Sequence, residues 1–239
     1  MFLGELGDIL GSESNFVQRK SKLGGSAFIQ MMSPFAEGNL IMKQSIVWVA
    51  NVMILIMIWS GLYLRGETWK AFGLTFTFVS WKNVLNVFLL SLLVFVLAMA
   101  GFILGSIIMV NITGMPQQAD MSGYDYLKDN VGMLLLSLAG VLFVSSFGEE
   151  VIYRGFLINR ITQLGADHKK SRIIAVVISS IIFGLVHYEW GAMGIVQTGL
   201  MGLALGFCYI LLKKRLWILI LAHAYMDTIL MVQLYLNSN

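Results

Sequence analysis

Two adjacent glutamates, Glu149 and Glu150, interrupt an apolar stretch in the second half of the chain, and Arg154 follows four residues after the second. A charged side chain at bilayer depth costs about 2.5–3.5 kcal/mol on insertion scales, so such residues are usually functional. On a helix, Glu150 and Arg154 would form an ion pair with the glutamate in the better, N-terminal position. Glu149 would lie about 100° further round that helix and face a cavity. We predict that Glu150 holds Arg154 and that Glu149 does chemistry. A solvated helix end with incidental charges is the alternative.

Two histidines and an aspartate follow in later apolar stretches. His187 comes four residues after Phe183, and His223 and Asp227 are four residues apart in one stretch. Residues at that spacing share one face of a helix. Asp227 has no lysine or arginine within one turn, so it must face the helix bundle and not lipid. For His187 taken alone, a structural or interfacial histidine is the alternative interpretation.

The spacing along the chain places these side chains at similar depths. Counted from the basic turns that flank the helices, Glu149 and His187 each lie 15 residues in, about 22 Å of α-helix. His223 and Asp227 lie 8 and 12 residues in, about 12 and 18 Å. If the helix that carries Glu149 runs unbroken through the glycine before it, the four side chains can meet in one site.

Such a set would support hydrolysis of an amide bond. A carboxylate and an imidazole that share a water can turn it into a nucleophile, with Glu149 as the general base. A second histidine and Asp227 would stabilise the developing oxyanion or protonate the leaving amine.

Three other interpretations stay open. Ser145 and Ser146 precede the glutamates by one turn and could offer a nucleophile, but nothing beside them resembles a nucleophile elbow or a Ser–Lys dyad. Glu149, His187 and His223 would make a plausible zinc shell with an open position, although the chain has no H-E-x-x-H motif. Buried carboxylates and histidines also form proton relays in transporters, but no inverted repeat or pair of broken helices supports this here.

The elements that position these residues must be membrane helices. Hydrophobic residues make up 58% of the 239 and charged residues only 12%, where a soluble domain carries about 25%. Mean hydropathy is +0.80. The basic residues behind the net charge of +3 stand in short runs between apolar stretches, which is typical of membrane topology and not of nucleic-acid binding. We predict an all-α, polytopic integral membrane bundle of about 6–8 helices with an intramembrane polar cavity.

Three regions are expected along the chain. They are an N-terminal interfacial segment over 1–42, transmembrane helices and a loop over 43–130, and a catalytic transmembrane core over 131–236. The second region would hold spans at 46–64 and 84–110, an aromatic interfacial connector at 65–82 and a soluble loop at 111–130. The core would hold helices at 131–164, 172–188, 192–212 and 216–236. Two GxxxG spacings, Gly101/Gly105 and Gly202/Gly206, predict close helix contacts.

The chemistry-bearing residues resemble the motifs of a known family. Three motifs occur in order within about 80 residues: Glu149-Glu150-x-x-x-Arg154, Phe183-x-x-x-His187 and His223-x-x-x-Asp227. They resemble the three motifs of the CPBP family, which comprises CAAX-type prenyl endopeptidases and bacteriocin-processing or immunity proteins. Tyr153-Arg154-Gly155 completes the first motif. The resemblance covers roughly residues 130–236.

The resemblance implies an all-helical membrane fold with a polar cavity and a metal-independent glutamate mechanism. In that mechanism Glu149 and His187 activate water, and His223 with the residue at 227 forms the oxyanion site. Glu150, Arg154, Tyr153 and Phe183 would be supporting residues. The prenyl endopeptidases have asparagine at the place of Asp227, and an ionised aspartate cannot donate a hydrogen bond to an oxyanion. Asp227 must be protonated, orient His223, or mark a divergent branch.

The sequence therefore predicts an intramembrane endopeptidase that acts on small membrane-associated substrates, such as a bacteriocin or pheromone precursor or a hydrophobic tail. A non-catalytic immunity or regulatory protein of the same fold is the alternative. No cofactor is expected, with zinc as the alternative, and the expected partners are the lipid bilayer and a hydrophobic substrate. The expected location is the bacterial cytoplasmic membrane, with several passes. The basic turns at 166–171 and 213–215 favour the cytoplasm, as do the basic residues near the N-terminus. Three spans, 46–64, 84–110 and 131–164, separate the N-terminal residues from the first of these turns, so both preferences hold only if one more segment spans, such as one within 65–82, or if the N-terminal segment lies on the other side.

Overall fold

A computed structural model describes residues 40–75, 80–114, 122–165 and 168–238. The chain divides into two compact units, Met1–Met57 and Ile58–Asn239, and every residue of the candidate site belongs to the second. Most of the segment predicted to be interfacial, 1–42, lies outside the described residues. Residues 40–42 form the start of a helix.

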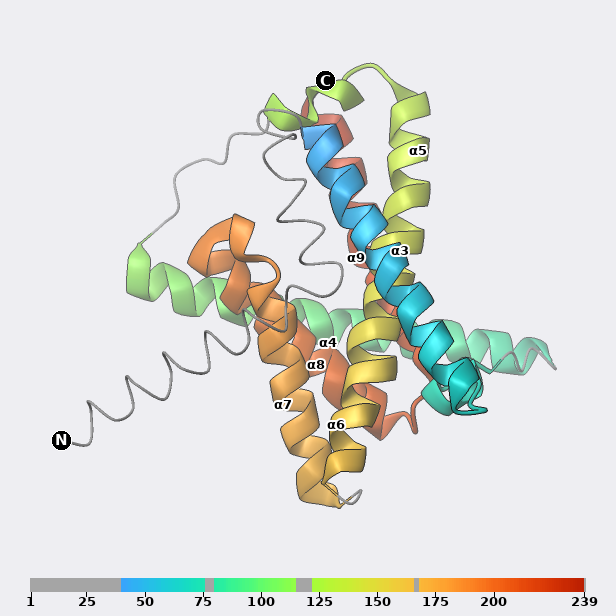
Figure 1. Cartoon of the computed structure of the whole chain (residues 1–239). Helices are drawn as coiled ribbons and strands as arrows, with labels where there is room; N and C mark the ends of the chain where they lie inside the picture. Colours follow the sequence, from blue (N-terminus) through green and yellow to red (C-terminus); the bar gives the residue numbers. More distant parts are fainter. Residues whose placement is uncertain (1–39, 76–79, 115–121, 166–167, 239) are drawn as a thin grey trace, which may run out of the picture. The chain divides into compact units, whose positions relative to one another are not determined.

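Every regular element in the described part of the chain is helical, which confirms the predicted fold class (Figure 1). Apart from short 3₁₀-helices, six helices occur there, within the predicted range. They are α3 (Leu40–Leu64), α4 (Trp81–Thr113), the continuous helix α5–η4–α6 (Val131–Leu164), α7 (Lys169–Leu185), α8 (Gly191–Leu211) and α9 (Leu216–Ser238). Five of them are long and apolar enough to cross a membrane. α7, with 17 residues, is the short one.

The helix that carries the glutamates runs unbroken through Gly148, as the depth argument required. It consists of α5 (Val131–Val141), η4 (Leu142–Ile158) and α6 (Asn159–Leu164), and the 17 residues of η4 form a π-helix. A π-helix bonds over five residues instead of four, and π-helical turns frequently occur at functional sites. Its wider turns hold more residues per unit length, so the α-helical estimate of about 22 Å overstates the depth of Glu149.

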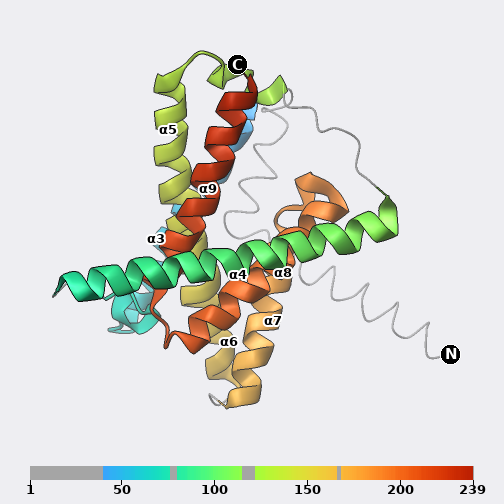
Figure 2. The same cartoon turned by 180° about the vertical axis from the view of Figure 1, so that it is seen from behind.

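Helices of the second unit cross at glycines. α4 runs across α8 and α9, and α7 packs along α8 (Figure 2). A Cβ atom added to Gly101 of α4 would lie 2.7 Å from the carbonyl oxygen of Leu200, and one added to Gly105 would lie 2.7 Å from Cα of Gln197. The predicted close contact through Gly101 and Gly105 is therefore confirmed, because only glycine lets the two backbones approach this closely.

Two segments predicted to be polar or interfacial contribute to the core instead. In the connector, the short helix η2 (Trp69–Phe72) buries Phe72, whose ring meets that of Phe156 edge-on at 6.1 Å. The hydroxyl of Tyr209 donates to the carbonyl oxygen of Phe72 at 3.0 Å. In the predicted soluble loop, α4 continues to Thr113, and the helix η3 (Ser122–Leu127) buries Leu127. Burial of these apolar side chains outweighs the polar character of their neighbours.

Leu127 packs against one end of α9. With Met231 and Leu234 it forms a buried cluster, and partly buried aromatic and aliphatic side chains surround it. This cluster anchors the end of α9 that lies beyond His223 and Asp227, and so helps to fix the helix that carries them.

Candidate active site

Glu150 is the centre of the buried polar network. Its side chain is fully buried, and its Oε1 accepts a hydrogen bond from Nη1 of Arg154 at 2.8 Å. The same oxygen lies 2.8 Å from Nδ1 of His223. Because an ionised carboxylate can only accept, Nδ1 of His223 is the donor. The predicted ion pair with Arg154 is present, and the sequence did not indicate the bond to His223.

Arg154 is enclosed by groups from two other helices. Its guanidinium lies 4.3 Å from the centre of the Phe183 ring, and its Nη2 donates to the carbonyl oxygen of Gly202 at 3.4 Å. A Cβ at Gly202 would lie 2.8 Å from Phe183 and 3.3 Å from Nη2 of Arg154. Gly202, predicted only as a packing glycine, therefore leaves the space that the buried arginine occupies.

Glu149 lies on the other side of His223. Its Oε2 is 3.9 Å from Nε2 of His223, and Oδ1 of Asp227 is 3.8 Å from the same nitrogen. These distances exceed that of a direct hydrogen bond. The Glu149 side chain is 15% exposed, against 0% for Glu150. Among the described residues, one buried oxygen of each glutamate, Oε2, has no hydrogen-bond partner.

Asp227 has a partner that the sequence did not assign to it. The hydroxyl of Ser146 donates to its Oδ2 at 2.6 Å. Ser146 had been considered only as a nucleophile. A signal was present in the sequence, because Ser146, Glu150 and Arg154 follow one another at intervals of four, which brings them towards one face of their helix.

His187 lies just beyond the end of α7. The prediction that it lies within a helix over 172–188 is therefore wrong. α7 ends at Leu185, and a turn leads into the short helix η5 (Tyr188–Trp190). Nδ1 of His187 is 2.8 Å from the carbonyl oxygen of Phe183. A carbonyl can only accept, so Nδ1 carries the hydrogen and Nε2 is the acceptor of the neutral ring. The turn leaves this ring half-buried and packed against Trp190, with ring centres 5.0 Å apart.

The ring of Phe183 packs against residues of all three motifs. It is fully buried, and its ring centre lies 5.0 Å from those of Tyr153 and His187 and 6.3 Å from that of His223. The carbonyl oxygen of Tyr153 accepts from the hydroxyl of Ser179 on α7 at 2.9 Å. The predicted supporting residues Tyr153 and Phe183 therefore both touch the site.

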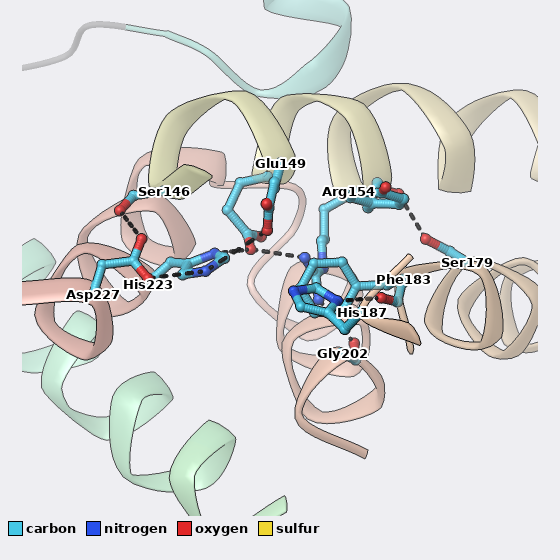
Figure 3. Close-up of polar contacts among 11 residues, drawn as sticks. Ser146, Glu149, Arg154, Ser179, Phe183, His187, Gly202, His223 and Asp227 are labelled. Carbon is cyan, nitrogen blue, oxygen red and sulfur yellow. Dashed lines mark hydrogen bonds and ion pairs between the residues drawn. The ribbon is translucent and has the colours of Figure 1, made fainter. Parts of the chain in front are cut away.

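The structure brings the four predicted catalytic residues into one region. Figure 3 shows Glu149, His187, His223 and Asp227 gathered where η4, the end of α7 and α9 meet. Glu149 and Asp227 lie 3.9 and 3.8 Å from the same nitrogen of His223, and the ring of Phe183 lies between those of His187 and His223, 5.0 and 6.3 Å from their centres. This proximity agrees with the depth argument, although the catalytic roles of the four residues stay predictions.

The positions of the candidate metal ligands can be compared with the zinc alternative. Among the described residues, no three His, Cys, Asp or Glu side chains stand close enough to hold a metal ion together. Nδ1 of His223 and Nδ1 of His187 are already bonded within the protein, which leaves each ring one nitrogen. A histidine whose other nitrogen is held in this way can still bind a metal, so the expectation of no cofactor stays a prediction.

One comparison with known protein families finds a match in this region. Residues 131–229 match the sequence model of the type II CAAX prenyl endopeptidase Rce1-like family, a part of the CPBP family. The resemblance of the three motifs is thereby confirmed, and they all fall within the matched residues. No curated protein and no solved structure matches this chain.

The match and the five apolar helices together support a class of protein. They indicate an integral, multi-pass membrane protein with a function of the CAAX-type intramembrane protease kind. Peptidase activity is the activity that the family suggests.

Proposed function

We propose that this chain is an intramembrane endopeptidase that cleaves a small membrane-associated peptide or a hydrophobic tail with water activated by Glu149. The observation that carries the proposal is the different use of two adjacent glutamates. Glu150 bonds to both Arg154 and His223. Glu149 faces Nε2 of His223 with a buried oxygen that has no hydrogen-bond partner among the described residues. A carboxylate so placed is available as a general base.

The proposed reaction begins with a water held by Glu149 and His187. Glu149 takes one proton from the water, and the remaining oxygen bonds to the carbonyl carbon of the scissile amide. The carbonyl oxygen becomes an oxyanion, which needs a donor. His223 can donate from Nε2 only as an imidazolium, because its Nδ1 hydrogen bonds to Glu150. The three surrounding carboxylates offset the charge of that imidazolium.

The reaction ends when the carbon–nitrogen bond breaks. The proton held by Glu149 passes to the leaving nitrogen, which departs as an amine, and the new carboxyl group forms at the carbon. Each group returns to its starting state, so the cycle consumes one water and one amide bond. No step requires a metal or a cofactor, and their absence from the mechanism is part of the proposal.

We assign Asp227 a different role from that of an asparagine at this position, which could donate a hydrogen bond to the oxyanion. Its Oδ2 accepts from Ser146, and its Oδ1 faces Nε2 of His223. An acceptor in that position orients the imidazole and does not itself donate to the oxyanion. Of the three options that the sequence left open, orientation of His223 is the one this geometry supports best.

The substrate class is proposed from the surroundings of the site. Glu149, His223 and Asp227 all lie within helices long and apolar enough to cross the bilayer. A substrate must therefore reach them from the membrane, as a prenylated or otherwise hydrophobic peptide would. A bacteriocin- or pheromone-like precursor in a bacterial cytoplasmic membrane would meet this requirement, and so would a CAAX-type tail.

A comparison of membrane peptides tests the proposal. Cells that express the wild type, Glu149→Gln or Glu67→Gln are compared by mass spectrometry of their membrane peptides. We expect new peptide ends with the wild type and with Glu67→Gln, which changes a glutamate outside the site, and none with Glu149→Gln. Normal processing by folded Glu149→Gln would contradict the proposal. If an immunity or signalling effect survived substitution of both Glu149 and His187, the non-catalytic alternative would hold.

A further inference from the structure

The hydroxyl of Ser146 has a different partner from the hydroxyls that bond within their own helix. Ser180, Thr198 and Thr228 each donate to the carbonyl oxygen four residues earlier in their own helix, at 2.7 Å. Ser146 is 1% exposed, and its hydroxyl instead crosses to α9 and donates to Asp227 at 2.6 Å. That distance lies in the range of a hydrogen bond to an ionised carboxylate. The hydroxyl therefore joins η4 to α9 within the site.

This bond completes a symmetrical arrangement around His223. Nδ1 of His223 bonds to Glu150 at 2.8 Å, and Glu150 is held in turn by Arg154. On the opposite side, Nε2 faces Oδ1 of Asp227 at 3.8 Å, and Asp227 is held in turn by Ser146. Each nitrogen of the imidazole thus has a carboxylate, and each carboxylate has a donor that fixes it. Without the hydroxyl, Asp227 could rotate and turn Oδ1 away from His223.

We propose that Ser146 is a positioning residue that acts through Asp227 on His223; this inference rests on the proposed function. It explains how an aspartate can occupy position 227. Asparagine has a donor and an acceptor at the end of its side chain, whereas an ionised aspartate has only acceptors. A buried carboxylate needs a donor to offset the loss of water. Ser146 supplies that donor and leaves Oδ1 directed at the imidazole.

The kinetic test compares hydroxyl deletions at two buried helical serines. The purified full chain in lipid vesicles is given a quenched-fluorescent peptide that ends in a farnesylated Cys-aliphatic-aliphatic-X sequence. Ser146→Ala should lower kcat by about 10- to 100-fold, the effect of a hydrogen bond to a charged group, and leave KM unchanged. Ser146→Thr, which keeps the hydroxyl, should restore most of kcat. Ser180→Ala, which removes a hydroxyl bonded within its own helix, should behave as the wild type.

A double-mutant comparison tests the route through Asp227. If Ser146 acts through that carboxylate, Ser146→Ala should cost much less in the Asp227→Asn background than in the wild type. Equal losses in both backgrounds would overturn the proposal. So would a Ser146→Ala variant that is indistinguishable from Ser180→Ala.

A second readout does not need catalysis. In protein labelled with ¹⁵N-histidine, the imidazole signals of His223, assigned with His223→Gln, should shift in Ser146→Ala and stay in place in Ser180→Ala. Unchanged His223 signals in Ser146→Ala would overturn the proposal. If the wild type cleaved no peptide, the proposed function would fail, and the NMR comparison would still decide whether Ser146 acts on His223.

Discussion

Replacing Glu150 by glutamine removes a charge on which two buried groups depend. Oε1 of Glu150 accepts bonds of 2.8 Å from Arg154 and His223, and Arg154 is 1% exposed. Glutamine keeps the shape and one carbonyl acceptor but leaves the guanidinium without a counter-ion. Removing one partner of a buried ion pair costs about 3–5 kcal/mol. We expect Glu150→Gln to lower the free energy of unfolding by about that amount.

The same substitution at Glu67 provides a matched control. Arg160 bonds to both oxygens of Glu67, at 2.7 and 3.2 Å, but the side chain of Arg160 is 17% exposed and that of Glu67 is 30% exposed. An exposed ion pair contributes about 0.2–1 kcal/mol, so Glu67→Gln should cost at least about 2 kcal/mol less than Glu150→Gln. Unfolding of the purified chain in detergent, followed by tryptophan fluorescence, measures both. Equal losses of stability would refute the view that Glu150 organises a desolvated network.

Two further predictions concern the packing and charge of the same unit. The hydrogen bond from Arg160 holds the pKa of Glu67 below its ordinary value. The ion pair therefore stabilises the fold fully at pH values above the ordinary pKa of a carboxyl group. This contribution is lost as the pH falls through the lowered pKa of Glu67. The stability difference between wild type and Glu67→Gln should therefore shrink on acidification, and a difference that grew would contradict the assignment. Gly202→Ala would place a Cβ 2.8 Å from Phe183 and should cost about 1–3 kcal/mol in stability, with loss of activity. Gly199→Ala, whose Cβ would have its nearest neighbour at 3.7 Å, should leave Tm close to that of the wild type, and equal shifts in Tm would refute the steric argument.

Much of the site could be predicted from the sequence because ionisable residues are rare and costly within apolar membrane helices. A glutamate pair, two histidines and an aspartate in apolar helices have few tolerable environments, and the count from the basic turns placed them at similar depths. The ion pair between Glu150 and Arg154 followed from local helix geometry. These predictions needed only the period and the rise of a helix.

Contacts between helices could not be predicted from the sequence in the same way. The bonds from His223 to Glu150 and from Ser146 to Asp227 join residues 73 and 81 positions apart, and their partners depend on the rotation of each helix. The π-helical turns of η4 alter that rotation, and nothing in the composition of residues 142–158 indicated them. The end of α7 was misjudged because the apolar run continues through Val186, whereas the chain turns there and places His187 outside the helix.

The burial of residues in the connectors 65–82 and 111–130 could not be predicted from the sequence either. Aromatic residues at 65–82 suit the membrane interface as well as a core. Phe72 is buried because Gly155 and Tyr209, from distant parts of the sequence, lie against it. Leu127 is one apolar residue in a polar segment, so it gave no periodic signal, although it packs fully against α9.

The most direct test of the central claim is the rate of peptide cleavage by purified Glu149→Gln in lipid vesicles. The substrate is a peptide that the wild type has been shown to cleave. A general base contributes about 10²- to 10⁴-fold to a rate, so we predict a loss of at least about 100-fold in a variant that keeps the Tm of the wild type. Cleavage at the wild-type rate by folded Glu149→Gln would contradict the assignment of Glu149 as the base that activates water.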